Sequence, residues 1–336
     1  VGEWQQCYER FPNGIEEVTN YIREKGMVPG VWLELEVMGI NCEKAKSVPD
    51  DWFFIRHGKR VYDRSRYQLD FRNPAVIDHV NEVIDRVVNQ YGVGYIKMDY
   101  NIEPGIGTEL YADSVGQGML EHERAYLKWL DGVFEKYPDL VIENCSSGGL
   151  RIQSTSDQED YRNYATIAAN AGAALTPEQA AIWSYPLKDG DEEETIYNMV
   201  NALLLRIHQS GHLAQLSKER HALVKEGIEY YKSIRQDIKK ALPVWPNGFA
   251  TSLDHFLCAG WKVEGKSYLA VWRRYGETSE YDIPLEKLTE GKPVKEVRLA
   301  YPKESLKEHV SYEVSEDQQL HVSFKEPVMA RIFEIR

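Results

Sequence analysis

The stretch that decides the fold is "GYIKMDYN", residues 94–101, in which charged side chains stand at the end of an apolar run. Tyr95 and Ile96 lead without a break into Lys97, Met98 and Asp99, whereas a strand facing solvent alternates polar and apolar residues along its whole length. Burying a charge costs free energy, so we interpret this stretch as a buried strand whose carboxyl end carries chemistry.

Lys97 and Asp99 are two residues apart, and alternate residues of one strand share a face. A cation on that face would keep the carboxylate ionised. A purely structural ion pair would give the same pattern, so both readings stay open at this point.

The first two thirds of the chain alternate short apolar runs with amphipathic segments, which is typical of β/α units around a parallel sheet. We expect strands over 27–36, 67–71, 92–99, 139–147, 151–157, 180–185 and 212–216. We expect helices over 13–26, 73–92, 120–136, 159–171, 192–210 and 218–241. These strands are one short of a (β/α)8 TIM barrel.

The pattern changes near residue 245. Short alternating runs separated by polar turns follow, which indicates a C-terminal antiparallel β-sandwich. We therefore expect a catalytic (β/α) barrel domain over residues 1–245, apparently lacking its first strand, and a β-sandwich domain over residues 246–336.

Composition excludes several classes of partner. The 336 residues are 43% apolar and 28% charged, with a formal net charge of −13, so nucleic acid and anionic membrane surfaces are expected to repel the protein. No run approaches the roughly 20 apolar residues of a membrane span. The four cysteines, Cys7, Cys42, Cys145 and Cys258, lack CxxC spacing, which argues against a zinc knuckle and favours a reducing, cytoplasmic compartment.

Three strand ends are unusually polar: "KMDYN", "ENCSSGG" and "STSDQED". Two of them supply Asp99 and Asp157, on different strands that would open on the same mouth of a barrel. A facing pair of carboxylates is what glycoside hydrolysis requires. A single aspartate at a strand end is more commonly a helix cap or a loop hydrogen-bonding group, so the pair carries more weight than either residue.

Several motifs resemble the α-galactosidase (melibiase) family of retaining glycoside hydrolases, glycoside hydrolase family 36. They are "FPNGIEEVTNYIREKGMVPGVWLELEVM" (11–38), "SRYQLDFRNPAV" (65–76), "YIKMDYN" (95–101) and "ENCSSGGLRIQSTSD" (143–157), and "GHLAQLSKER" and the terminal sandwich are similar as well. The resemblance implies that Asp99 is the nucleophile and Asp157 the general acid/base.

The same resemblance implies a sugar-binding set around this pair: Trp32, Arg64, Lys97, Asn101, Cys145 and Gly148. Arg64 is favoured over its neighbour Arg66 by register alone. Without the resemblance, a core aromatic is an alternative for Trp32, and an inert buried thiol is the more common reading of Cys145.

This chain also departs from the family. Met98 and Tyr100 stand where the family has tryptophan and methionine, and "LELE" replaces a proline-containing "EPE". The family's N-terminal β-domain and the first barrel strand, with its Asp-Asp-Gly-Trp type segment, have no counterpart here, and the chain starts at Val1.

The expected function is hydrolysis of terminal α-galactosides by double displacement, with α-galactoside oligosaccharides as partners and no metal or other cofactor. A homo-oligomer is left open. The alternatives are an α-galactosyl transferase or α-N-acetylgalactosaminidase of the same fold. A non-catalytic carbohydrate-binding or structural chain is a further alternative, because of the missing strand.

Overall fold

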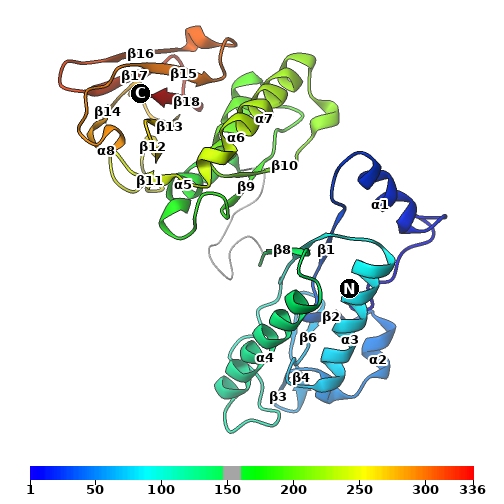
Figure 1. Cartoon of the computed structure of the whole chain (residues 1–336). Helices are drawn as coiled ribbons and strands as arrows, with labels where there is room; N and C mark the ends of the chain where they lie inside the picture. The colour runs from blue at the N-terminus through cyan, green and yellow to red at the C-terminus, as the bar shows by residue number, and fades with distance from the viewer. Residues whose placement is uncertain (147–159) are drawn as a thin grey trace. The chain divides into compact units, whose positions relative to one another are not determined.

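A computed structural model describes residues 1–146 and 160–336, which pack as two compact units (Figure 1). Unit 1 spans Val1–Thr155 and unit 2 spans Ser156–Arg336. Within the described ranges, no helix has both the length and the apolar character that crossing a bilayer requires.

Unit 1 is built on a parallel sheet of three strands in the order β1-β7-β8 (Figure 1). The strands are β1 (Gly30–Leu33), β7 (Tyr95–Met98) and β8 (Val141–Asn144). Their register aligns Trp32, Lys97 and Glu143 in one row across the sheet. This confirms the strands expected near residues 27–36, 92–99 and 139–147.

The helices of unit 1 cover this sheet: α1 (Ile15–Glu24), α3 (Pro74–Asp85) and α4 (Val115–Lys136). The Asn73 side chain caps α3 by accepting the Ala75 N–H at 2.9 Å, and Pro74 occupies the first helical position, where its missing N–H costs nothing. A π-helical turn, Arg86–Gln90, continues α3, and Gly92 follows with φ 67°. Buried valines of α3 pack against Ile96 and Met98 of β7 in one core.

The strand expected at 67–71 belongs to a different sheet, so its assignment to the parallel sheet is wrong. β6 (Arg66–Gln68) pairs antiparallel with β2 (Val37–Gly39) and β5 (Tyr62–Asp63). The shorter elements between them are α2 (Glu43–Ser47), a 3-10 turn (Asp50–Trp52), β3 (Ile55–Arg56) and β4 (Lys59–Arg60). An apolar β-prone run identifies a strand but does not choose its partner or direction.

Unit 2 begins with α5 (Tyr161–Asn170), β9 (Ala181–Ser184), α6 (Glu192–Leu203), β10 (Arg206–Gln209) and α7 (Lys218–Ile238). β9 and β10 are parallel. The helix expected over 192–210 ends at Leu203, and 206–209 is a strand. The strand expected over 212–216 is instead a 3-10 turn, Leu213–Gln215. The apolar residues 202–205 and Ile207 fit either a helix or a strand, and pairing of 206–209 with β9 decides between them.

Two antiparallel sheets complete unit 2. The five-stranded sheet has the order β11-β12-β13-β18-β15 and the three-stranded sheet the order β14-β17-β16. The five strands are β11 (Leu242–Val244), β12 (Phe256–Val263), β13 (Lys266–Arg273), β18 (Met329–Ile335) and β15 (Val297–Tyr301). The other three are β14 (Glu280–Pro284), β17 (Gln319–Phe324) and β16 (Val310–Val314), with the short α8 (Glu286–Thr289) after β14. Leu269, Val271, Phe324 and Phe333 from both sheets form one apolar core between them, as a β-sandwich requires.

The five-stranded sheet is the middle of three layers, because its other face packs against helices α5 to α7 (Figure 1). Trp261, Trp272 and Ile332 lie on that face, and the Trp272 indole N–H donates to Asn201 Oδ1 of α6 at 2.9 Å. The domain boundary at residues 245/246 stays a prediction. It falls after β11, so it would separate the first strand of the five-stranded sheet from the rest of that sheet, which shares a core with α7.

Adjacent residues of β18 test this shared core. Ile332 faces the helices and Phe333 faces the second sheet, and neither has exposed surface. Replacing either by alanine leaves a cavity, so we expect Ile332→Ala to cost about 2–5 kcal/mol and Phe333→Ala about 3–5 kcal/mol. Urea unfolding followed by circular dichroism should show both variants lowering the midpoint of the same transition.

Glu313→Ala on the exposed β16 is the matched control, with an expected change within about 0.5 kcal/mol. Separate transitions for the helices and the sheets, with Ile332→Ala affecting only one of them, would contradict a shared core.

Candidate active site

The site lies at the carboxyl ends of β1, β7 and β8, which are neighbours in one parallel sheet. Backbone pairing continues past the strands, since the Asp99 N–H donates to the Leu33 carbonyl and the Cys145 N–H to the Met98 carbonyl, both at 2.8 Å. Asp99 is therefore held by the backbone at the point where the βα-loops begin, which is where parallel β/α sheets place their functional groups.

Several hydrogen-bond donors hold the Asp99 carboxylate. Oδ2 accepts the Trp32 indole N–H at 2.8 Å and the Asn101 side-chain amide at 2.7 Å, while Oδ1 accepts the Tyr100 backbone N–H at 2.8 Å. Burial, with only 9% of the residue exposed, acts to raise the pKa of Asp99. Hydrogen bonds from Asn101, Trp32, the Tyr100 backbone and Cys145 outweigh burial, so the pKa lies below the usual aspartate value and the carboxylate is ionised at neutral pH.

Lys97 forms an ion pair with Glu143, whereas its spacing in the sequence favours a pair with Asp99. Its Nζ lies 2.8 Å from Oε1 of Glu143 on the neighbouring strand, and the Tyr95 hydroxyl donates to the other oxygen of the same carboxylate. Hydrogen-bond donors therefore account for the lowered pKa of Asp99. Glu143 was not singled out from the sequence, and the signal for it is its place in a second polar strand end, "ENCSSGG".

Glu34 is a second carboxylate at this edge that the sequence did not single out. It is fully buried, and it accepts the Asn101 backbone N–H at 2.6 Å and the Arg66 Nε–H at 2.7 Å. Glu34 thereby links Arg66 to the residue that donates to Asp99. Its signal was the unusual "LELE" sequence directly after Trp32.

Arg64 and Arg66 occupy different environments. Arg64 lies in a turn with φ 45°, its side chain is 53% exposed, and it pairs with Asp63 and Glu103 at 3.8 and 3.5 Å. Arg66 is on β6 and reaches the strand end through Glu34. The structure therefore links Arg66, through Glu34, to the residue that donates to Asp99. The sugar-binding role expected for Arg64 stays a prediction.

Trp32 is 39% exposed, which argues against a core aromatic. Its ring meets the edge of Trp4, with 5.6 Å between the ring centroids. An exposed aromatic surface whose N–H holds a carboxylate suits contact with a sugar, because sugars present apolar C–H faces beside hydroxyl groups. Trp32 stays a predicted sugar-binding residue on this ground.

The remaining predicted residues divide into two groups. Cys145 follows β8 directly, is partly buried and hydrogen-bonds to Asp99. Asp157 and Gly148 lie outside the described residues. The acid/base role of Asp157 and the sugar contact of Gly148 therefore stay predictions.

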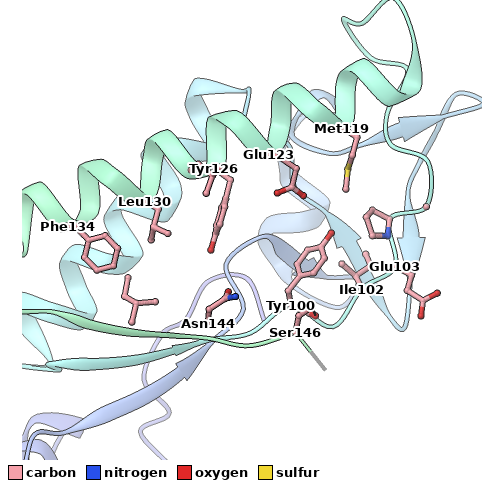
Figure 2. Close-up of a pocket in the computed structure, with 14 residues that line it drawn as sticks. Tyr100, Ile102, Glu103, Met119, Glu123, Tyr126, Leu130, Phe134, Asn144 and Ser146 are labelled. Atoms are coloured by element: carbon pink, nitrogen blue, oxygen red, sulfur yellow. Dashed lines mark hydrogen bonds between the residues drawn. The ribbon is translucent and has the colours of Figure 1, made fainter. Parts of the chain in front are cut away.

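A pocket of about 580 Å³ is lined by side chains of α4 and by residues of β8 and of the segments that follow β7 and β8 (Figure 2). Alternate strand residues point to opposite faces, so Tyr100 and Asn144 face α4 while Lys97 and Asp99 do not. Figure 2 shows Tyr100, Asn144 and Ser146 opposite α4 side chains such as Tyr126 and Leu130. This pocket is therefore distinct from the Asp99 cluster.

Across residues 1–146 and 160–336, no three or more histidine, cysteine, aspartate or glutamate side chains are grouped as a metal site would need. The chemistry that the described cluster offers is that of an ionised carboxylate beside amide, indole and cationic hydrogen-bond donors. Such a set can attack an electrophilic carbon and bind neighbouring hydroxyl groups.

Removing Arg66 would leave the Glu34 charge buried without its cation. We expect Arg66→Gln to lower the unfolding free energy by up to about 3–5 kcal/mol, measured by urea denaturation. Glu34→Gln keeps an oxygen for the Asn101 N–H, so its loss should be smaller. Arg64→Gln, an exposed matched control, should change stability by less than about 1 kcal/mol. Equal losses for Arg64→Gln and Arg66→Gln would contradict this assignment of the two arginines.

Comparison with known proteins identifies relatives of the chain. Residues 1–157 match the Melibiase family model. An α-galactosidase of Lactobacillus acidophilus is 24% identical over 251 residues, which cover 70% of this chain and 34% of the relative. The bifunctional α-galactosidase/sucrose kinase of Mediterraneibacter gnavus is 28% identical over 154 residues, or 46% of this chain and 16% of the relative.

Among solved structures, a variant of the family 36 α-galactosidase AgaA from Geobacillus stearothermophilus in complex with stachyose is similar with a TM-score of 0.76 at 16% identity. That match covers 100% of this chain and 48% of the solved chain. The chain spans about a third of the length of the first curated relative, 34%. These matches confirm the resemblance expected from the sequence: residues 1–157 match the Melibiase family model, and the chain is similar to α-galactosidases over most of its length.

Proposed function

We propose that this chain carries the catalytic machinery of an α-galactosidase that cleaves terminal α-galactosides by double displacement. The observation that carries the proposal is the Asp99 carboxylate, which is buried yet ionised and is held by hydrogen-bond donors at the end of a parallel strand. A nucleophile needs this state, because only the ionised carboxylate can form a bond to the anomeric carbon.

In the first step, an Asp99 oxygen attacks the anomeric carbon while the bond to the leaving oxygen breaks and Asp157 protonates that oxygen. A galactosyl ester of Asp99 forms. In the second step, Asp157 removes a proton from water, the water oxygen attacks the same carbon, and galactose leaves with retained configuration. Asp99 returns to its ionised state.

The neighbouring residues would bind the sugar. Trp32 offers a partly exposed ring, and Lys97 and Asn101 offer charged and amide donors on the same edge of the sheet. Arg66 is the arginine that we place beside them. Oligosaccharides that end in an α-linked galactose are the proposed substrates, and the stachyose complex of the Geobacillus relative supports this class.

The fold we propose for the catalytic part of the whole protein is a (β/α)8 barrel. The parallel sheet β1-β7-β8 within unit 1 and the parallel pair β9-β10 within unit 2 each have the geometry of part of such a barrel. Placement of Asp99 at a carboxyl strand end supports the same fold.

Asp99→Ala in the full-length protein should remove the nucleophile. We expect hydrolysis of an aryl α-galactoside to fall by about 1,000-fold or more, because no covalent intermediate can form. Azide added to this variant should take the place of the carboxylate and give β-galactosyl azide, detected by NMR of the products. Asp113→Ala, in an exposed loop, is the control and should keep full activity. Unchanged turnover in Asp99→Ala would refute the nucleophile assignment.

The amide of Asn101 lowers the pKa of Asp99, so its removal should raise that pKa. The low-pH limb of kcat/KM reports the ionisation of the free enzyme's essential carboxylate. We therefore expect this limb to move to higher pH in Asn101→Ala, measured with the same substrate across the acid range. A limb that stays in place would show that Asp99 is not the group that controls it.

A further inference from the structure

Tyr100 is the residue after Asp99, and it is anchored at three points. Its backbone N–H donates to Asp99 Oδ1, its carbonyl accepts the Ser146 hydroxyl, and its own hydroxyl donates to Gln68 Oε1, each at 2.8 Å. Its side chain points to the α4 face of the sheet and is 7% exposed (Figure 2). One residue thus connects the reactive edge of the sheet to the buried space behind it.

Gln68 is a firm anchor because its amide has a defined orientation. The residue is fully buried on β6, and its Nε2 donates to the Leu69 carbonyl at 3.1 Å, which directs Oε1 toward the Tyr100 hydroxyl. His122 of α4 touches the same amide at 3.5 Å. Strands β6 and β7 and helix α4 therefore meet at this side chain.

His122 is itself fixed. Its Nδ1 accepts the Phe71 backbone N–H at 3.1 Å, so in the neutral ring the proton is on Nε2, which lies 3.3 Å from Glu36 Oε2. The ring packs edge-on against Phe54 and Phe71, with centroids 4.8 and 5.5 Å away. We refer to Glu36, Gln68, Tyr100 and His122 as the Tyr100 anchor.

We propose that Tyr100 is a positioning residue for Asp99: the anchor fixes residue 100 so that its backbone N–H points at Asp99 Oδ1 before any substrate is present. This inference rests on the proposed function of Asp99 as nucleophile. Fixed donors need no rearrangement at the moment of reaction, which is what makes them effective in catalysis.

The anchor and the reactive face differ in their charged groups. On the Asp99 face these are Lys97 with Glu143, the thiol of Cys145, and Glu34 with Arg66 beyond Asn101. On the α4 face they are Glu36 with His122, and Glu123 in the pocket lining. Replacing the Tyr100 hydroxyl changes none of these charges, so an effect on Asp99 would come from a shift of the backbone that positions the Tyr100 N–H and the adjoining Asn101 amide.

The test is Tyr100→Phe in the full-length protein, which removes one oxygen and keeps the ring. We expect kcat for an aryl α-galactoside to fall about 10-fold with KM little changed, because a misplaced group affects the reacting geometry more than binding. We also expect the pKa of Asp99, followed by carbon NMR of its carboxyl group, to rise as the Tyr100 N–H moves away from Oδ1.

Tyr126→Phe is the matched control. Tyr126 is a buried tyrosine of α4 in the same pocket lining, on the face away from Asp99. This variant should leave the Asp99 titration and the kcat-to-KM pattern as they are. A second variant, Tyr100→Phe with Gln68→Leu, removes both partners of the Tyr100–Gln68 hydrogen bond, so Gln68 Oε1 is not left buried without its donor if the single variant folds poorly.

Two results separate the outcomes. A folded Tyr100→Phe, or the double variant, with an unchanged Asp99 titration would overturn the positioning role. Absence of galactosidase activity in the unaltered protein would overturn the proposed function instead, and the NMR titration would still test whether Tyr100 positions Asp99.

Discussion

The structure of unit 1 around its site depends on one constraint, which is that the Asp99 charge is buried and must be stabilised by donors. A carboxylate taken out of water costs several kcal/mol unless hydrogen bonds replace its hydration. The donors come from Trp32 on β1, from Tyr100 and Asn101 after β7, and from Cys145 after β8. The strand order β1-β7-β8 brings these side chains to one point, so the site depends directly on the strand order.

The two faces of this small sheet have separate roles because strand residues alternate. One face presents Lys97, Asp99 and Glu143, and the other packs Ile96 and Met98 into the core with α3 and α4. The Tyr100 side chain lies on the packed face, whereas its backbone N–H donates to Asp99 on the reactive face. Substitutions in the core behind the sheet can therefore affect the Asp99 carboxylate without contacting it.

Sequence patterns predicted an element well where its start or end depends only on residues adjacent in the sequence. Asn73 and Pro74 marked the start of α3, and the polar end of "GYIKMDYN" located the site. The wrong predictions concern segments whose structure depends on the strand with which they pair. Residues 66–68 form an antiparallel strand and residues 206–209 form a strand rather than the end of a helix. In both cases the local sequence fits more than one structure until its neighbour is known.

The same reasoning explains which site residues could not be identified from the sequence. Lys97 and Asp99 are two positions apart and invite pairing along one strand, yet the ion pairs that form are Lys97 with Glu143 and Arg66 with Glu34, between elements 46 and 32 residues apart. Such pairs are set by the register between strands, which no short window of sequence contains. A charge at a strand end therefore locates a site from sequence, whereas the partner that neutralises it follows only from the three-dimensional pairing.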